Sequence, residues 1–284
     1  MPYFGAHMSI AGGLHHAFTH LAAVDGEALQ IFTRNQRQWQ VSALDKEETA
    51  LFKEVRQQSK VKTVASHTSY LINLASTNKE IIRKSIEALA AELSRSEKLE
   101  IDYVILHPGS HMGNGIGIGL QRLVDNLDKC FTLTNDSSKI EVLIETTAGQ
   151  GTGIGSTFEQ IAQILNASNY SARLGVCLDT CHVYAAGYDF RTAEGYHAMM
   201  DEFDATIGLK KLRLFHLNDS RKAVRSHVDR HEHIGKGQIG LQGFAHLITD
   251  ERFAEHSMII ETPKGKDLTE DKENLKILKE LAKI

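Results

Sequence analysis

The sequence is poor in the features that mark secreted, membrane-bound or multidomain proteins. Its three cysteines, Cys130, Cys177 and Cys181, are too few and too odd in number for a disulfide framework in 284 residues, so we expect reduced thiols. No apolar stretch approaches the roughly 18 residues that cross a bilayer. The N-terminal MPYFGAHMSIAGG resembles no signal peptide, and no Pro/Ser-rich linker marks a boundary. These absences predict a cytoplasmic protein with one domain over residues 1–284.

The chain also lacks an excess of positive charge. Its formal net charge is −4 with neutral histidines, which taken alone argues against a nucleic-acid partner, because such proteins usually carry a basic surface. Hydrophobic residues make up 42% and charged residues 24%, the composition of an ordinary globular protein. One large core is therefore feasible.

Short apolar runs alternate along the chain with stretches of helical periodicity. We interpret eight runs as strands: YFGAH at 3–7, ALQIFT at 28–33, TVASH at 63–67, YVILH at 103–107, EVLIE at 141–145, LGVCLD at 174–179, LRLFHL at 212–217 and MIIE at 258–261. Thr77 and Glu80 form a capping-box pattern ahead of one intervening helix. Propellers have units of similar length but need four strands in each. The alternation therefore predicts an α/β fold, a single (β/α)8 TIM barrel.

Six of the eight predicted strands end on or beside a side chain that can bind a metal ion. These side chains are His67, His107, Glu145, Asp179, His216 and Glu261. One such residue alone is more often simply hydrogen-bonded, but the carboxyl ends of all strands in a TIM barrel meet on one face. Carboxylates inside a barrel are also costly unless a cation or hydrogen bonds compensate them. The sequence therefore predicts a shared metal site at this face.

The segment FHLNDSRKAVRSHVDRHEHIG, residues 215–235, adds a second group of potential ligands. Asp229 and His231 are two residues apart, so an extended backbone would turn both toward one ion. His182, on the loop expected after the sixth strand, would complete a set of two histidines and one carboxylate. Nitrogen and oxygen ligands without an obligatory thiolate suit zinc, manganese or iron, and open coordination positions mark a catalytic site.

Other side chains nearby are weaker candidates. His227 and His233 fit exposed loop histidines better than ligands. The motif CLDTC at 177–181 could hold a metal, but two small buried thiols are the simpler interpretation.

The motifs together resemble endonuclease IV, the zinc-dependent apurinic/apyrimidinic endonucleases of base-excision repair, and they extend over nearly the whole chain. They are GAHMSIAGGL at 5–14, NQRQW at 35–39, YLINLAS at 70–76, LHPGSH at 106–111, ETTAGQG at 145–151, LDTCHVYAAGYD at 178–189, HLNDS at 216–220, DRHEHIGKGQIG at 229–240 and ETP at 261–263. LDTCH and DRHEHIGKG are the most specific. Thr68 departs from the Asp that is usual in the family, and His227 from the commoner Arg.

This resemblance implies three zinc ions per chain, which Mn²⁺ or Fe²⁺ could partly replace. One is held by His67, His107 and Glu145, and a second by Glu145, Asp179, His216 and Glu261. The third is held by His182, Asp229 and His231. The resemblance further implies that Arg37, Tyr70 and Leu71 enter duplex DNA at the lesion.

The implied reaction is phosphodiester hydrolysis on the 5′ side of abasic sites, with trimming of blocked 3′ ends. Two ions bridged by Glu145 would share and activate a water, and Glu261 is a candidate acceptor of its proton. Three Zn²⁺ ions would add six positive charges and bring the formal net charge to +2, which weakens the objection to a DNA partner. We expect the enzyme to act as a monomer.

Two other functions remain open at this point. A sugar isomerase or epimerase of similar barrel also places Glu, Asp and His around a divalent ion, but needs neither the third set nor wedge residues. A non-catalytic module that binds damaged DNA would use its metals for structure alone, and structural zinc sites are usually closed and four-coordinate.

Overall fold

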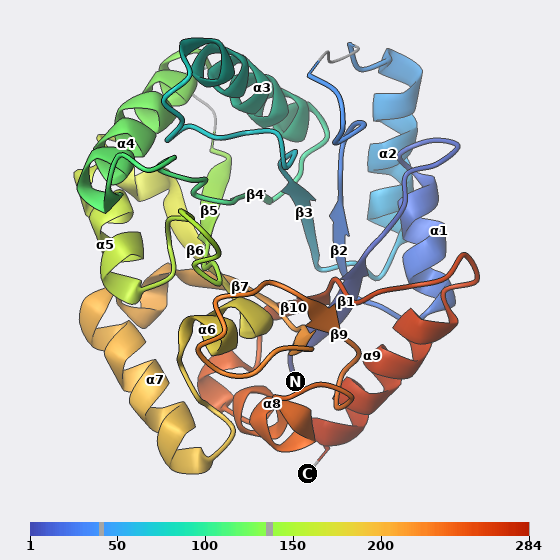
Figure 1. Ribbon diagram of the computed structural model, residues 1–284. Coiled ribbons are helices and arrows are strands. Elements are labelled where there is room, and N and C mark those ends of the chain that lie inside the picture. The colour runs from blue at the N-terminus through green and yellow to red at the C-terminus, as the bar shows by residue number, and fades with distance from the viewer. Residues whose placement is uncertain (40–42, 135–138, 284) are drawn as a thin grey trace.

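The computed structural model describes residues 1–39, 43–134 and 139–283, which form a closed barrel surrounded by helices. Eight strands run around the barrel in the order β1, β10, β7, β6, β5, β4, β3 and β2, and neighbours pair in parallel. Seen along its axis, the barrel lies inside a ring of helices (Figure 1). The TIM barrel expected from the sequence is confirmed.

The barrel strands are β1 Tyr3–His7, β2 Ala28–Ile31, β3 Thr63–His67, β4 Tyr103–Leu106, β5 Glu141–Glu145, β6 Leu174–Asp179, β7 Leu212–His216 and β10 Ser257–Ile260. Each coincides with a predicted strand to within two residues at either end. The largest difference is in β2, which ends at Ile31 rather than residue 33. Beyond Ile31 the chain leaves the sheet, and Thr33 Oγ1 donates to the buried carboxylate of Glu92 at 2.8 Å.

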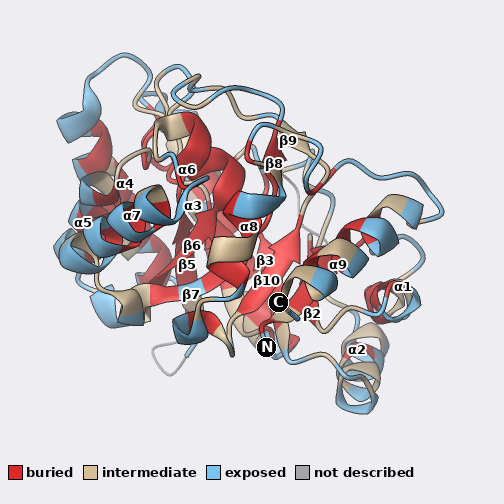
Figure 2. Ribbon diagram, turned by 90° about the horizontal axis from the view of Figure 1, so that it is seen from below, coloured by how far each residue is buried: buried red, intermediate tan, exposed pale blue. Residues whose placement is uncertain are grey.

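The helices are α1 His16–Ala23, α2 Lys46–Gln58, α3 Lys79–Lys98, α4 Ile116–Thr132, α5 Phe158–Ala167, α6 Thr180–Ala186, α7 Ala193–Thr206, α8 Gly240–Ile248 and α9 Thr269–Leu281. Single 3-10 turns lie at Ser171–Arg173, Leu209–Lys211 and Glu251–Phe253. The outer helices bury the faces that pack on the barrel and expose the opposite ones (Figure 2), whereas α6 is buried over nearly its whole length. In the part of the chain that the structure describes, none of them is long and apolar enough to cross a membrane.

The start of α3 differs from the predicted capping box. The N-cap is Asn78 rather than Thr77, and its Oδ1 accepts from the backbone N–H groups of Glu80 at 2.9 Å and Ile81 at 3.2 Å. One side-chain oxygen thus satisfies two of the free donors at the helix end. The predicted N-cap, Thr77, was therefore wrong by one residue, because the Asn78 side chain is the one that accepts from both backbone N–H groups.

The interior of the barrel is filled by a belt of apolar residues, one from each of seven strands. The belt consists of Ala28, Ala65, Ile105, Leu143, Cys177, Leu214 and Ile259, all completely buried. Gly5 of β1 pairs with both Ala28 and Ile259, and a Cβ there would lie 1.6 Å from the Ala28 carbonyl oxygen. Only glycine allows the backbones of β1 and β2 to approach this closely. The belt closes the barrel beneath its carboxyl ends.

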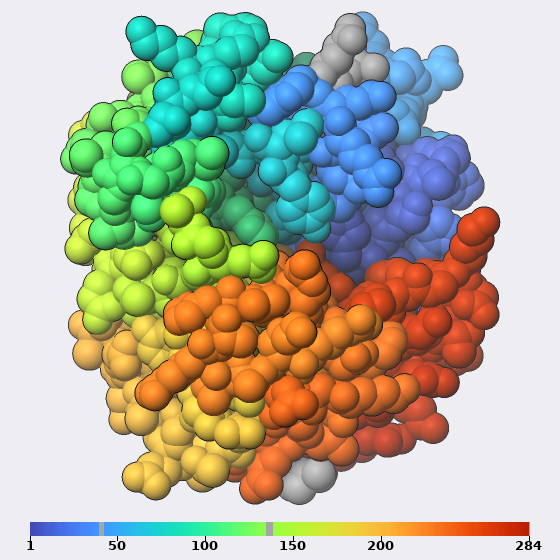
Figure 3. All heavy atoms as spheres, in the orientation of Figure 1, coloured from blue at the N-terminus to red at the C-terminus, as the bar shows by residue number. Residues whose placement is uncertain are grey.

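The connection between β7 and α8 contains the antiparallel pair β8 Asp219–Ser220 and β9 His231–Glu232, which the sequence did not predict. The buried Asp219 carboxylate accepts from the backbone N–H groups of Gly235 and Gly237, both at 3.0 Å, and of Ile239 at 2.9 Å. This connection, orange in Figure 3, covers part of the face at the carboxyl ends of the strands. Asp219 therefore fixes the segment that carries Asp229 and His231.

Candidate metal centre

Eight polar side chains form a ring directly above the apolar belt. Each follows a belt position, or Gly5 on β1, by two residues, and alternate residues of a strand face the same side. The ring consists of His7, Gln30, His67, His107, Glu145, Asp179, His216 and Glu261. The six strand-end ligands predicted from the sequence thus occupy equivalent positions in the barrel.

Two members of this ring, His7 and Gln30, were not among the predicted site residues. His7 is the last residue of a correctly predicted strand, so its position alone could have identified it. Gln30 was hidden because the second strand was predicted two residues too long, which placed it inside the strand rather than near the end. In the structure Gln30 is completely buried.

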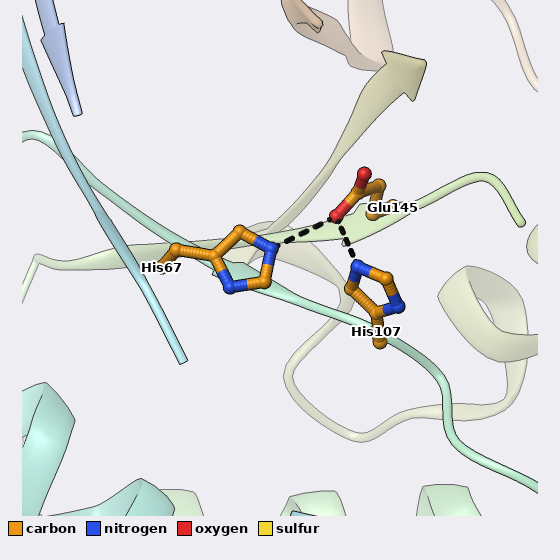
Figure 4. A group of neighbouring side chains, drawn as sticks. All are labelled: His67, His107 and Glu145. Carbon is orange, nitrogen blue, oxygen red and sulfur yellow. Dashed lines mark hydrogen bonds and ion pairs between the residues drawn. The ribbon is translucent and has the colours of Figure 1, made fainter. Parts of the chain in front are cut away.

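His67, His107 and Glu145 meet at a single carboxylate oxygen. Glu145 Oε2 lies 3.1 Å from His67 Nε2 and 2.9 Å from His107 Nε2, as the dashed lines in Figure 4 show. The Nδ1 of His67 donates to the backbone carbonyl of Thr68 at 2.8 Å, so the Nε2 lone pair is directed into the site. One oxygen and two nitrogens converge here as a metal ion would require.

Glu145 also belongs to a second group through its other oxygen. His216 Nδ1 lies 3.0 Å from Glu145 Oε1, 3.2 Å from Glu261 Oε2 and 3.8 Å from Asp179 Oδ2. Glu145 and Asp179 are completely shielded from solvent, whereas Glu261 keeps 14% of its side chain exposed. Three carboxylates and one imidazole therefore surround one point beside the first group.

His182, Asp229 and His231 form the third group. His182 Nε2 lies 3.1 Å from Asp229 Oδ2, and His231 Nε2 lies 3.3 Å from Asp229 Oδ1. His182 lies on α6 rather than on a loop, because Asp179 caps that helix and accepts from the backbone N–H of His182 at 2.8 Å. Asp179 thereby links the second group to the third. In all three groups the potential ligand atoms lie within 4.8 Å of one another.

The charges in these groups are strongly coupled. Burial by itself would raise the pKa of Glu145, but the imidazoles of His107 and His216 outweigh it and hold that pKa well below its usual range. Burial likewise opposes ionisation of Asp229, yet His182 and His231 lower its pKa to about 2. Imidazole protons thus balance the carboxylates, and divalent cations between the same atoms would balance them directly.

The chemistry of the donors fits such cations. His231 Nε2 is buried and has no hydrogen-bond partner, although two carboxylates, Asp229 and Asp179, face it at 3.3 and 3.7 Å. A buried polar atom of this kind calls for a partner, and a cation between the nitrogen and the carboxylates would supply one. Imidazole nitrogen and carboxylate oxygen are ligands for zinc, manganese and iron.

The cysteines are free and buried, as expected from the sequence. Cys181 lies close enough to Asp179 and His231 to form an alternative group of ligands. Burial raises the pKa of its thiol to about 12. Asp229 lies closer to His231 Nε2, at 3.3 Å, than Asp179 does, at 3.7 Å, which favours the group of His231 with His182 and Asp229.

The two departures from the family motifs have local structural explanations. His67 Nδ1 donates to the backbone carbonyl of Thr68, so the orientation of the His67 ring does not depend on a carboxylate side chain at position 68. The ring of His227 donates from Nδ1 to the carbonyl of Ala148 at 3.0 Å, and the backbone N–H of Asp229 donates to Gln150 Oε1 at 3.1 Å. His227 thus joins the β7–α8 connection to the loop after β5.

His233, the other histidine that the sequence suggested as an exposed loop residue, is half-buried and hydrogen-bonded to Asn274.

Arg37, Tyr70 and Leu71 lie on the two loops that follow β2 and β3. Tyr70 is 66% exposed, Arg37 is exposed and Leu71 is half-buried. Ser69 Oγ donates to the carbonyl of Gln36 at 2.5 Å, which ties the two loops together. The Tyr70 ring also packs near the rings of His67 and His107, with centroids 5.7 and 6.1 Å apart. The three residues therefore lie beside the metal-capable groups without belonging to them.

Two cavities flank His107 on this face. One of about 200 Å³ is lined by Tyr70, Asn73 and Ser110. The other, of about 170 Å³, is lined by Gln150, His182 and Asp229. The metal-capable groups are thus accessible from two sides.

Comparison with known proteins shows which family this chain resembles in sequence and structure. Residues 18–281 match the family model described as xylose isomerase-like TIM barrel. A probable endonuclease 4 from Chloroflexus aurantiacus is 46% identical over 99% of this chain and 98% of its own length. The crystal structure of endonuclease IV from Thermus thermophilus is 35% identical, with a TM-score of 0.89 over 99% of both chains.

A D-tagatose 3-epimerase-like protein also superposes, with a TM-score of 0.73 over 99% of this chain and 98% of its own, but is only 20% identical. That likeness shows a shared fold alone. The full-length identity to relatives named endonuclease 4 and the close match to a solved endonuclease IV are the more specific findings, and the chain belongs to the endonuclease IV family.

Proposed function

We propose that this protein is a zinc-dependent DNA-repair endonuclease that hydrolyses the phosphodiester 5′ to abasic sites in duplex DNA. The products would be a 3′-hydroxyl and a 5′-deoxyribose phosphate, and the same site would trim phosphates and phosphodiesters from blocked 3′ ends. The observation that carries the proposal is the convergence of nine potential ligands in three adjoining groups on an accessible face. Membership of the endonuclease IV family supports the nuclease activity.

Three zinc ions fit the residues present. His67 and His107 with Glu145 would hold one, Asp179, His216 and Glu261 with Glu145 the second, and His182, Asp229 and His231 the third. Mn²⁺ or Fe²⁺ would serve in part, since the donors are nitrogen and oxygen. When bound, such ions supply a water nucleophile at neutral pH and stabilise the charge that develops on the phosphate.

The protein's own side chains divide the remaining tasks. Glu145, fixed between histidines on both of its oxygens, would hold two ions at a set separation. Glu261 is the partly exposed carboxylate of the ring, and His216 depresses its pKa against the effect of burial. It would therefore be ionised, as an acceptor for the proton of the attacking water has to be before the reaction.

Substrate selection would depend on the loops above the ring. An abasic nucleotide has to be taken out of the helical stack before its phosphate can reach a recessed site. Tyr70 presents an exposed ring at the rim, and Arg37 and Leu71 flank it. These three side chains would fill the space that the extruded nucleotide leaves, as wedge residues do in other DNA-bending proteins. Three bound Zn²⁺ ions would also make this face electropositive.

The alternatives fit the geometry less well. A sugar isomerase would use the Glu145, Asp179, His216 and Glu261 group but leave the third group without a role. A module with purely structural zinc would enclose its ions, whereas the side chains of Asp229 and His107 are 41% and 31% exposed. Openness toward solvent favours a catalytic site.

Each ligand group is complete within one chain, which supports action as a monomer. The ligands also come from segments between residues 67 and 261, which supports the single domain expected over residues 1–284. A DNA substrate fits the cytoplasmic location that the sequence predicts.

The first prediction concerns metal dependence. Protein purified without added metal should contain close to three zinc ions per chain by elemental analysis and should nick abasic duplex DNA without added Mg²⁺, because its ligands are preassembled. An absolute need for added Mg²⁺ would indicate another class of nuclease. Conversion of a ketose with abasic DNA left intact would indicate the isomerase.

The second prediction concerns Glu261. Glu261→Gln should lower single-turnover incision by at least about 100-fold while changing affinity for abasic DNA by less than about tenfold, because the amide cannot accept a proton. Glu141→Gln, at the opposite end of β5 in an ion pair with Arg213, is the matched control and should cut normally. Equal losses of incision and affinity in Glu261→Gln would remove the catalytic role.

The third prediction separates recognition from hydrolysis. Tyr70→Ala should weaken binding to abasic duplex by roughly 1–3 kcal/mol, the scale of one aromatic stacking contact. Tyr70→Phe keeps the ring and should bind like the wild type, and both variants should retain wild-type zinc content. Removal of a 3′-phosphate from a flexible end should suffer less than internal incision. Zinc loss in Tyr70→Ala, or equal slowing of both reactions, would assign Tyr70 to the core instead.

A further inference from the structure

Gln30 lies in the ring of strand-end residues and contacts two of the potential zinc ligands. Its Oε1 lies 2.7 Å from His216 Nε2, and its Nε2 lies 2.5 Å from Glu261 Oε1. The second N–H of the amide points to His7 Nδ1 at 2.9 Å. The four residues come from the carboxyl ends of four strands: Gln30 on β2, His216 on β7, His7 on β1 and Glu261 directly after β10.

The orientation of the amide follows from its neighbours. The Glu261 carboxylate only accepts hydrogen bonds, so the amide nitrogen faces it and the amide oxygen faces His216. His216 must then carry a proton on Nε2 to donate to Gln30. Its Nδ1, which faces Glu145 and Glu261, is left with the lone pair that a metal needs.

Three of the other histidines that could bind metal are oriented differently. His67, His182 and His231 each direct Nδ1 to a backbone carbonyl, of Thr68, Thr146 and Glu261 respectively, at 2.8, 2.8 and 3.3 Å. His216 instead relies on the side chain of Gln30. Its orientation can therefore be altered by one substitution that leaves every ligand in place.

We propose that Gln30 is a positioning residue of the zinc site: its amide fixes the tautomer of His216 and the rotation of the Glu261 carboxylate, so that both face the ion shared with Glu145 and Asp179. This inference rests on the proposed zinc-dependent function. Partners behind metal ligands typically contribute about 10–100-fold to metal affinity or activity. Gln30 does not touch the ion, and its effect is exerted through His216 and Glu261.

The test compares the release of zinc from fully loaded proteins into excess chelating dye. Gln30→Met has a similar length but no polar group, and should release one of its three ions at least about tenfold faster than the wild type. Gln30→Glu keeps an acceptor for His216 but replaces the amide donor with a second carboxylate beside Glu261, so it should release the ion at least as fast as Gln30→Met. Unchanged release from Gln30→Met, or release from Gln30→Glu at the wild-type rate, would overturn the proposal.

Ser257→Ala is the matched control. Ser257 is also buried, and its hydroxyl donates to Thr63 Oγ1 at 2.7 Å at the opposite end of the barrel strands. Loss of this hydrogen bond should leave zinc release unchanged. Faster release from Ser257→Ala, equal to that from Gln30→Met, would show a general loosening of the barrel and would also overturn the proposal.

A measurement on the wild type covers the case in which Gln30→Met does not fold. Long-range ¹H–¹⁵N correlation spectra of the zinc-loaded protein should show His216 protonated on Nε2, with Nδ1 carrying no proton. The reverse tautomer would contradict the role of Gln30. If the wild type binds three zinc ions but leaves abasic DNA intact, the proposed function fails while this test of Gln30 remains valid.

Discussion

The carboxylate of Glu145 is negatively charged, completely buried and faced by four imidazole rings, and the other parts of the site are arranged around it. His67 and His107 contact one oxygen, at 3.1 and 2.9 Å, while His216 and His182 lie 3.0 and 3.4 Å from the other. An unpaired carboxylate at this depth would cost several kcal/mol. The barrel meets that cost by bringing positive or hydrogen-bonding partners from other strands to the same level. The same histidines can also bind metal ions. The side chains that compensate the buried charge of Glu145 are therefore also the ones that could hold ions.

The parallel barrel makes this arrangement possible through register. An apolar belt of inward-facing residues closes the interior, and the next inward position on each strand carries a polar group. On each strand the polar residue follows the apolar one by only two positions. The apolar layer belongs to the packed core, and the polar layer faces the site. The segments that follow the strands add the remaining ligands. Asp179 caps α6 and so presents His182, while Asp219 accepts from backbone N–H groups of the connection that carries Asp229 and His231. The tied loops after β2 and β3 then place Tyr70 beside the ring.

The sequence predicted the barrel well because its strands are short, apolar and regularly spaced, and because strand ends in this fold share one face. For the same reason, the six strand-end ligand candidates could be expected to lie together. Sequence reasoning was less successful where side chains decide local detail. The capping residue of α3 was misplaced by one position, the small β8–β9 pair was missed, and His182 was expected on a loop rather than a helix. Gln30 was missed because a glutamine inside an apolar run gives no signal of its own, and only its hydrogen bonds to His216 and Glu261 reveal it. The metal roles of these residues and the DNA contacts of Arg37, Tyr70 and Leu71 stay predictions, since proximity alone does not establish them.

One ring of strand-end residues, extended by α6 and by the β7–α8 connection, would hold three zinc ions around Glu145. Anomalous diffraction at the zinc absorption edge, from crystals grown without added metal, tests it most directly. We expect three peaks, each about 2.0–2.2 Å from the nitrogen and oxygen atoms of one ligand group, with Glu145 contacting two of them. A single peak confined to Glu145, Asp179, His216 and Glu261, or a peak held by Cys181, would contradict it.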